Sequence, residues 1–217
     1  MRLQKLLTAL LALTMILTSA ELTSEARRKK DNKAKYIFLF IGDGMGMGQV
    51  TLADSYLSYK AGELGGEQLA FSRFPYLALC NTYSANRNIT CSAAGGTAIA
   101  CGEKTNNEHI GVNPEGKPLE SIAYVLHDKG YNVGIMTTVP VNHATPAAFY
   151  GHNSSRYGYY DISREIVDSG FEFFGGSGFY NYKGREGDKP AVDIYIEENG
   201  YDVCYGPKEF KARDNDR

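Results

Sequence analysis

An uninterrupted apolar run near the N-terminus constrains the fold more than any other feature of the chain. Residues Lys35–Ile41 read KYIFLFI, and the glycine-rich stretch Gly42–Gly48 follows. A strand with one solvated face alternates polar and apolar residues, whereas a run without alternation is typical of a strand covered on both faces. Such strands occur in parallel sheets flanked by helices, so the run predicts an α/β protein.

The rest of the chain alternates helix-like and strand-like segments from start to end, without internal repeats or a domain boundary. The expected strands are Lys35–Ile41, Leu77–Tyr83, Tyr131–Thr138, Phe171–Phe174 and Tyr201–Cys204. The expected helices are Gln49–Lys60, Ser92–Cys101, Pro118–Lys129, Ala147–His152, Ile162–Ser169 and Asp193–Glu198. This alternation predicts an α/β layered fold with a mainly parallel sheet.

The composition is that of an ordinary globular protein. The 217 residues are 43% hydrophobic and 22% charged, with a formal net charge of -2. This length suffices for one sizeable core, and the near-neutral charge gives no reason to expect a nucleic-acid partner. The four cysteines lack the spacing of a metal site, so we expect free thiols, with a disulfide left open. They are Cys80, Cys91, Cys101 and Cys204.

The first residues have the pattern of a targeting segment. Arg2 and Lys5 precede the apolar run Leu6–Leu17, and small residues follow up to Ala20. This predicts a signal peptide over residues 1–20, a basic linker over 21–34 and the folded domain over 35–217. An uncleaved membrane anchor is the alternative, although the run is short for a membrane span. We expect a periplasmic or secreted protein without a stable membrane anchor after cleavage.

Two side chains stand where α/β proteins place ligand-binding groups. Asp43 ends the first apolar run, and ligands bind beyond the carboxyl ends of parallel strands. Ser92 opens a predicted helix, whose free N–H groups favour a phosphate. Each residue also has a purely structural interpretation, because Asp forms Asx turns and Ser caps helices.

Three further candidates follow the strand expected at Tyr131–Thr138. His143 and Thr145 belong to the stretch HATP, and Arg156 lies thirteen residues after the histidine. The planar guanidinium of an arginine can hold two phosphate oxygens at once. A structural histidine, a turn threonine and a surface salt bridge are the alternative interpretations.

The order of these motifs is more specific than any one of them. The motifs that follow one another along the chain are Asp43 with Gly44-Met45-Gly46, Ser92-Ala93-Ala94, Thr97-Ala98, Gly102–Asn106, His143–Ala147 and Arg156. Two further stretches, Phe74–Tyr76 and Phe174–Gly176, fit the same pattern. In this order the chain resembles the alkaline phosphatase family from about Lys35 to about Gly206. The resemblance implies a three-layer α/β/α sandwich and hydrolysis of phosphate monoesters through a phosphoserine.

The resemblance also implies cofactors and roles. Family members hold two Zn²⁺ and one Mg²⁺, and Asp43 would bridge one zinc and the magnesium. Ser92 would be the nucleophile and a zinc ligand, Thr145 a magnesium ligand, and His143 would contact the groups around the magnesium. Arg156 would bind the non-bridging phosphate oxygens. Family members are commonly dimers, which implies a homodimer for a full-length protein.

Two departures from the family pattern stand out. The residue before the nucleophile is usually Asp, and here it is Cys91, so Arg156 is expected to be held less firmly. The family's remaining metal ligands lie later in a chain about twice this length. This sequence has only His109, His127, His143 and His152. We therefore expect the N-terminal portion of an alkaline phosphatase, truncated at the C-terminus and inactive alone.

Two other functions are compatible with parts of the sequence. A sulfatase-like hydrolase would use a modified Cys or Ser, but Cys91–Gly95 lacks the arginine of that motif. An exported, non-catalytic fragment could bind phosphate or a metal through Arg156 and the helix end at Ser92.

Overall fold

The computed structural model of the chain describes residues 34–212. The chain divides into two compact units, one up to Gly42 and one from Asp43 onward. The signal peptide and the basic linker expected over residues 1–34 fall outside the described residues, apart from Ala34.

The apolar run in the first unit does not become a strand. Residues 35–41 form neither helix nor strand, and Phe38 and Phe40 are 78% and 89% exposed. The strand expected at Lys35–Ile41 is therefore wrong for this structure. Apolar composition favours a covered strand, but a strand exists only where a neighbouring strand pairs with its backbone N–H and C=O groups.

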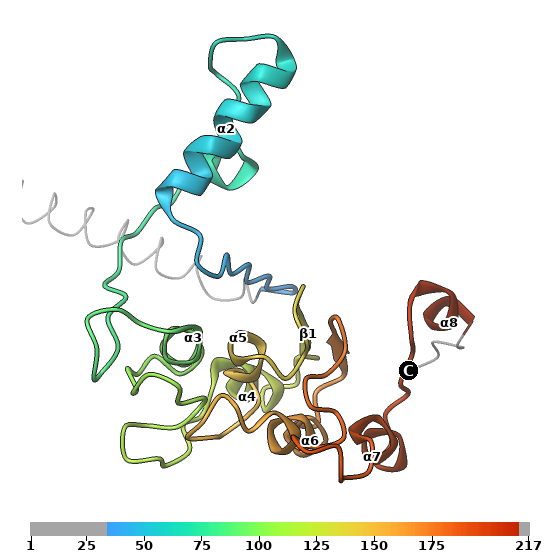
Figure 1. The fold of residues 1–217 in the computed structure, drawn as a ribbon. Coiled ribbons are helices and arrows are strands. Elements are labelled where there is room, and N and C mark those ends of the chain that lie inside the picture. The colour runs from blue at the N-terminus through green and yellow to red at the C-terminus, as the bar shows by residue number, and fades with distance from the viewer. Residues whose placement is uncertain (1–33, 213–217) are drawn as a thin grey trace, which may run out of the picture. The chain divides into compact units, whose positions relative to one another are not determined.

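The second unit contains the described helices and strands (Figure 1). The α-helices are α2 (Met47–Ala61), α3 (Ser92–Cys101), α4 (Ile122–His127), α5 (Ala144–Ala147), α6 (Tyr159–Ser169), α7 (Val192–Glu198) and α8 (Pro207–Ala212), and η1 (Ala70–Arg73) is a 3-10 turn. The strands are β1 (Gly134–Met136) and β2 (Phe173–Gly175). All six expected helices have a counterpart here, and α3 has the expected bounds.

Helix α5 shows how proline shifted one expected boundary. We expected a helix over Ala147–His152, opening after Pro146, but the helix is Ala144–Ala147 and includes this proline. His143, with φ -69° and ψ 159°, is the residue that precedes the helix. Proline is tolerated in a first helical turn because its missing N–H would have no partner there. The earlier start places Thr145 inside the helix.

The two described strands form a small parallel sheet. Gly134 pairs with Phe173, Ile135 with Phe174 and Met136 with Gly175, and the connection between the strands contains α5 and α6. This crossover is the βαβ arrangement expected of an α/β fold. The strands expected at Tyr131–Thr138 and Phe171–Phe174 are therefore present, although the paired parts are short.

Two other expected strands are wrong. Leu77–Tyr83 and Tyr201–Cys204 have no strand in the structure, and Leu77 and Leu79 are 92% and 95% exposed. Short apolar runs are ambiguous in sequence, because pairing with another segment decides whether they become strands.

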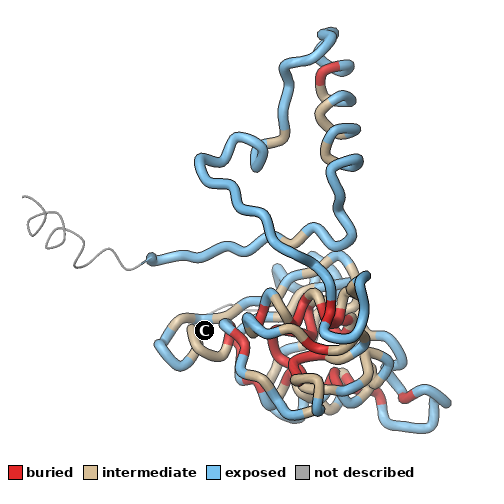
Figure 2. Tube along the Cα trace, turned by 90° about the vertical axis from the view of Figure 1, so that its left-hand side faces the viewer, coloured by how far each residue is buried: buried red, intermediate tan, exposed pale blue. Residues whose placement is uncertain are grey.

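Small residues bring α3 and α5 into close contact. Ala93, Ala94, Ala144 and Ala147 are all 2% exposed or less. A Cβ added at Gly96 would lie 3.1 Å from the Cβ of Ala148. The backbones approach closely only because these positions lack bulk, and this approach brings the start of α3 toward α5. Figure 2 shows the buried residues of the chain in red.

Candidate phosphate and metal site

Ser92 is the first residue of α3, and its hydroxyl does not cap the helix. The preceding Cys91 has the extended backbone of a capping position, with φ -101° and ψ 169°. The Ser92 hydroxyl instead donates a hydrogen bond of 3.1 Å to Oδ1 of Asp43. The interpretation of Ser92 as a simple cap is therefore wrong, and its oxygen lies beside the positive end of a helix.

The Asp43 carboxylate joins two hydroxyl groups that are far away in the sequence. Its Oδ1 accepts from Ser92, and its Oδ2 accepts from the Thr145 hydroxyl at 2.8 Å. Helix α2 is preceded by Gly46, so Asp43 does not cap it. The next residue, Gly44, has φ +69°, which suits the tight turn that follows the carboxylate. Three of the five predicted site residues thus meet at one carboxylate.

The other two predicted residues form a pair of their own. Nη2 of Arg156 lies 3.1 Å from Nε2 of His143. A guanidinium has only donors, so Nε2 accepts and the imidazole carries its proton on Nδ1. Burial and the charge of Arg156 lower the pKa of His143, against the opposing effect of Asp43. The histidine is thus a neutral acceptor that holds the arginine.

Two polar atoms of this pair are buried without a partner within the described chain. They are Nδ1 of His143 and Nε of Arg156. Both are donors in the arrangement above, and a buried donor without an acceptor costs about 1–3 kcal/mol. The pair is therefore suited to an added group that brings acceptor oxygens, such as a phosphate or a water.

Cys91, where the family usually has Asp, has partners that sequence reasoning did not identify. Its Sγ accepts from the backbone N–H of Glu108 at 3.1 Å, and its own N–H donates to Oδ1 of Asn107 at 3.1 Å. Burial raises the pKa of the Cys91 thiol, but hydrogen bonds from Ala94, Glu108 and Ala93 and the charge of Arg156 outweigh it, so the pKa is lowered. All four cysteines are free thiols.

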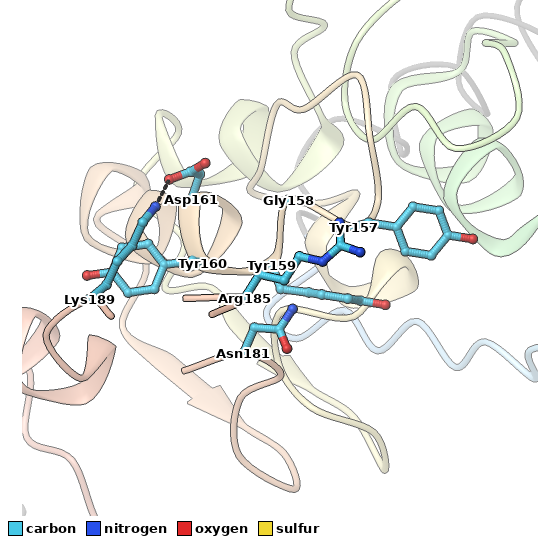
Figure 3. Close-up of a pocket in the computed structure, with 8 residues that line it drawn as sticks. All are labelled: Tyr157, Gly158, Tyr159, Tyr160, Asp161, Asn181, Arg185 and Lys189. Atoms are coloured by element: carbon cyan, nitrogen blue, oxygen red, sulfur yellow. Dashed lines mark ion pairs between the residues drawn. The ribbon is translucent and has the colours of Figure 1, made fainter. Parts of the chain in front are cut away.

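Two hollows in the surface are lined by residues other than Asp43, Ser92 and Thr145. A cavity of about 120 Å³ adjoins the start of α6, just after Arg156 in the chain (Figure 3). It is lined by Tyr157, Gly158, Tyr159, Tyr160, Asp161, Asn181, Arg185 and Lys189. A groove of about 520 Å³ is lined by Pro118, Leu119, Glu120, Tyr124, Asp128, His152, Glu165 and Asp168. Neither hollow contains Asp43, Ser92 or Thr145.

The donor atoms at Asp43 suit one class of cation better than another. One carboxylate and two hydroxyls are oxygen donors, which Mg²⁺ prefers, whereas Zn²⁺ sites combine carboxylate oxygens with histidine nitrogen or cysteine sulfur ligands. Within residues 34–212, no group of three or more His, Cys, Asp or Glu side chains is placed to hold a metal ion. The group therefore fits part of a magnesium site and lacks the ligands of two zinc sites.

Comparisons with known proteins place the chain in a family. The sequence profile of alkaline phosphatase matches residues 34–172. The alkaline phosphatase of Gadus morhua is 40% identical over an alignment of 152 residues, and the match covers 64% of this chain and 32% of that protein. The chain thus spans about a third of the length of this curated relative.

Solved structures agree with the sequence comparison. The alkaline phosphatase of Thermus thermophilus superposes with a TM-score of 0.69 at 32% identity, covering 81% of this chain and 37% of that one. A histidine variant of TAB5 alkaline phosphatase, with Mg bound in its M3 site, superposes with a TM-score of 0.61 at 31% identity, covering 73% and 43%. These structural matches agree with an α/β fold. The chain belongs to the alkaline phosphatase family.

Proposed function

We propose that this chain carries the nucleophile and part of the metal site of a phosphate monoester hydrolase. The observation that carries the proposal is the Asp43 carboxylate, which accepts hydrogen bonds from both Ser92 and Thr145. The His143–Arg156 pair adds a cationic group for the phosphate, and family membership supplies the reaction class.

Ser92 is proposed as the nucleophile. Its oxygen attacks phosphorus as the hydroxyl gives up its proton, and the bond from phosphorus to the ester oxygen breaks. The leaving alkoxide takes up one proton, which balances the one lost by Ser92. The result is a phosphoserine, which water then hydrolyses to release phosphate and restore the hydroxyl. Free N–H groups at the start of α3 stabilise negative charge on the phosphoryl oxygens. Asp43 orients the hydroxyl through Oδ1.

Arg156 is proposed to bind two non-bridging oxygens of the phosphate. Its Nη2 is held by His143, and its Nε is buried without a partner in the described chain. An anion placed against Nε would satisfy that donor and offset the guanidinium charge. Because His143 is neutral, the positive charge of the pair that attracts the anion belongs to Arg156.

The proposed cofactors are one Mg²⁺ and two Zn²⁺, as in the family. Asp43 and Thr145 offer oxygen ligands to Mg²⁺, while Asp43 and Ser92 supply only two of the ligands that zinc requires. A bound divalent cation would lower the pKa of the serine hydroxyl and shield charge on the leaving oxygen. The other zinc ligands are outside this group of residues.

Substrate, location and assembly are also proposed from the family. The substrates are phosphate monoesters, a full-length protein is a homodimer, and the location is periplasmic or secreted. The described helices are all too short or too polar to cross a lipid bilayer.

Calorimetric titration with inorganic phosphate in the presence of Mg²⁺ tests the site. We expect the wild-type chain to bind phosphate and Arg156→Ala to bind it at least about tenfold more weakly, because a charge-assisted bond is lost. Asp43→Asn should weaken the Mg²⁺ dependence. The matched control is Arg164→Ala, since Arg164 lies over the ring of Tyr195.

The control variant should bind phosphate as the wild type does. Absence of phosphate binding by the wild-type chain, or equal weakening by Arg156→Ala and Arg164→Ala, would show that the proposed site is wrong.

A further inference from the structure

We propose that Asn142 is a positioning residue that sets the geometry of the His143–Arg156 pair. The inference rests on the role proposed above for Arg156 as the phosphate-binding arginine. Asn142 itself touches neither Arg156 nor the Asp43 group through any hydrogen bond within the described chain. Its effect is to hold the two segments from which His143 and Arg156 extend.

Asn142 is fully buried and has hydrogen-bond partners on both sides of its amide. Its Nδ2 lies 3.1 Å from the carbonyl oxygen of Tyr159, 2.9 Å from Oγ of Ser163 and 2.9 Å from the carbonyl oxygen of Tyr180. Its Oδ1 accepts from the N–H of Tyr180 at 2.9 Å. Two N–H groups serve three acceptors, so no other uncharged side chain of this size could replace the amide.

These contacts reach both members of the pair. Asn142 directly precedes His143 in the chain, and Tyr159, the first residue of α6, lies three residues after Arg156. One side chain therefore fixes the backbone on both sides of the 3.1 Å contact between the imidazole and the guanidinium. Loss of the amide would release both segments together.

Tyr180 provides a second connection to the same pair. Both its N–H and its carbonyl oxygen bond to Asn142, and its ring packs 6.2 Å from that of His143 and 5.0 Å from that of Tyr159. Because Asn142 anchors this backbone, it also keeps an aromatic ring against the imidazole. The orientation of His143 thus depends on Asn142 in two ways, through the adjacent backbone and through the ring of Tyr180.

The test uses the full chain labelled with ¹⁵N and free of ligand. We expect the ring nitrogens of wild-type His143 to give the signals of one tautomer, protonated at Nδ1, with slow solvent exchange at Nε of Arg156. In Asn142→Asp, the donors are lost and a carboxylate faces two carbonyl oxygens. The two ring signals should then move toward each other, and exchange at Nε should become at least about tenfold faster.

A milder variant keeps the test decisive if Asn142→Asp does not fold. Ser163→Ala removes one acceptor of Asn142 and should change the same signals in the same direction, to a smaller extent. The control is Ser169→Ala at the other end of α6, which removes a buried hydroxyl bonded to the carbonyl oxygen of Ile166. It should lower the melting temperature and leave both signals at their wild-type values.

Wild-type signals for His143 and Arg156 in both Asn142→Asp and Ser163→Ala would overturn the proposal, because Asn142 would then only stabilise the fold. Equal changes in the Ser169→Ala control would overturn it as well. Failure of the proposed function is a separate outcome. In that case wild-type Arg156 would not respond to added phosphate, while the ligand-free signals would still depend on Asn142.

Discussion

A single carboxylate defines the candidate site at the level of residues. Asp43 accepts from Ser92 and from Thr145, two residues that have no relation in the linear sequence. The types and order of these residues could be read from the sequence, whereas the hydrogen bonds between them could not. Asn107, Glu108 and Asn142 were not anticipated, because asparagine and glutamate in a loop carry no distinctive sequence signal.

The raised pKa of His152 leads to a prediction about how the stability of the protein depends on pH. A hydrogen bond to Glu165 raises the pKa of His152, and burial opposes this effect. The negative charge of Glu165 and a hydrogen bond to the Leu119 carbonyl oxygen raise the pKa further. A raised pKa in the folded state stabilises the protein below the unfolded-state pKa, about 6.5. This stabilisation is lost as the pH rises through the folded-state pKa.

We therefore expect the contribution of His152 to the free energy of unfolding to fall as the pH rises above about 6.5 and through the raised folded-state pKa. Urea unfolding of the wild type and of Glu165→Gln, at intervals above pH 5.5, checks this. The difference in stability between the two should shrink as the pH rises. A difference that is independent of pH would contradict the prediction. Comparing the two chains removes the opposite contribution of His143, whose pKa is lowered.

At the level of elements, helix positions were predictable and strand pairing was not. Helix α3 has its expected bounds because a small-residue stretch ends at Gly102, which has φ +72°. The strand expected at Leu77–Tyr83 failed because a strand needs a partner, which a local pattern does not specify. The close contact of α3 with α5 explains why small residues were needed at all.

A substitution at Gly96 tests the close contact of α3 with α5. A Cβ there would lie 3.1 Å from Ala148 and 3.4 Å from the backbone of Thr145, so Gly96→Val should destabilise the fold by about 1–3 kcal/mol through overpacking. The matched control is Gly95→Ala, whose Cβ would lie 3.5 Å from Thr90.

The control should be neutral or stabilise α3 by about 0.5–1 kcal/mol, because alanine favours a helix. Thermal or urea unfolding measures both changes. A Gly96→Val variant as stable as the wild type would mean that α3 and α5 tolerate a larger separation.

At the level of the whole molecule, metal ligands limit what the chain is expected to do. Of the four histidines, His143 is paired with Arg156, and His127 and His152 face Glu172 and Glu165. His109 contacts Thr105 and the Asn113 carbonyl through Nδ1. In the described chain, none of these four histidines belongs to a cluster of metal ligands around Asp43.

We therefore expect the purified chain to show little or no turnover of an aryl phosphate with added Zn²⁺ and Mg²⁺. The control is Ser92→Ala, which should give the same low background. Robust turnover by the wild type that Ser92→Ala abolishes would contradict this expectation and would show that these residues complete a working site.

The sequence by itself determined the α/β class, the family resemblance and the identity of the candidate site residues. These follow from local patterns and from the order of short motifs, which act over a few residues each. Only the tertiary structure decided that Asp43 lies between two hydroxyls, that His143 holds Arg156 and that Asn142 anchors both segments of that pair. Such contacts join residues far apart in the chain, and they depend on how closely α3, α5 and α6 can pack.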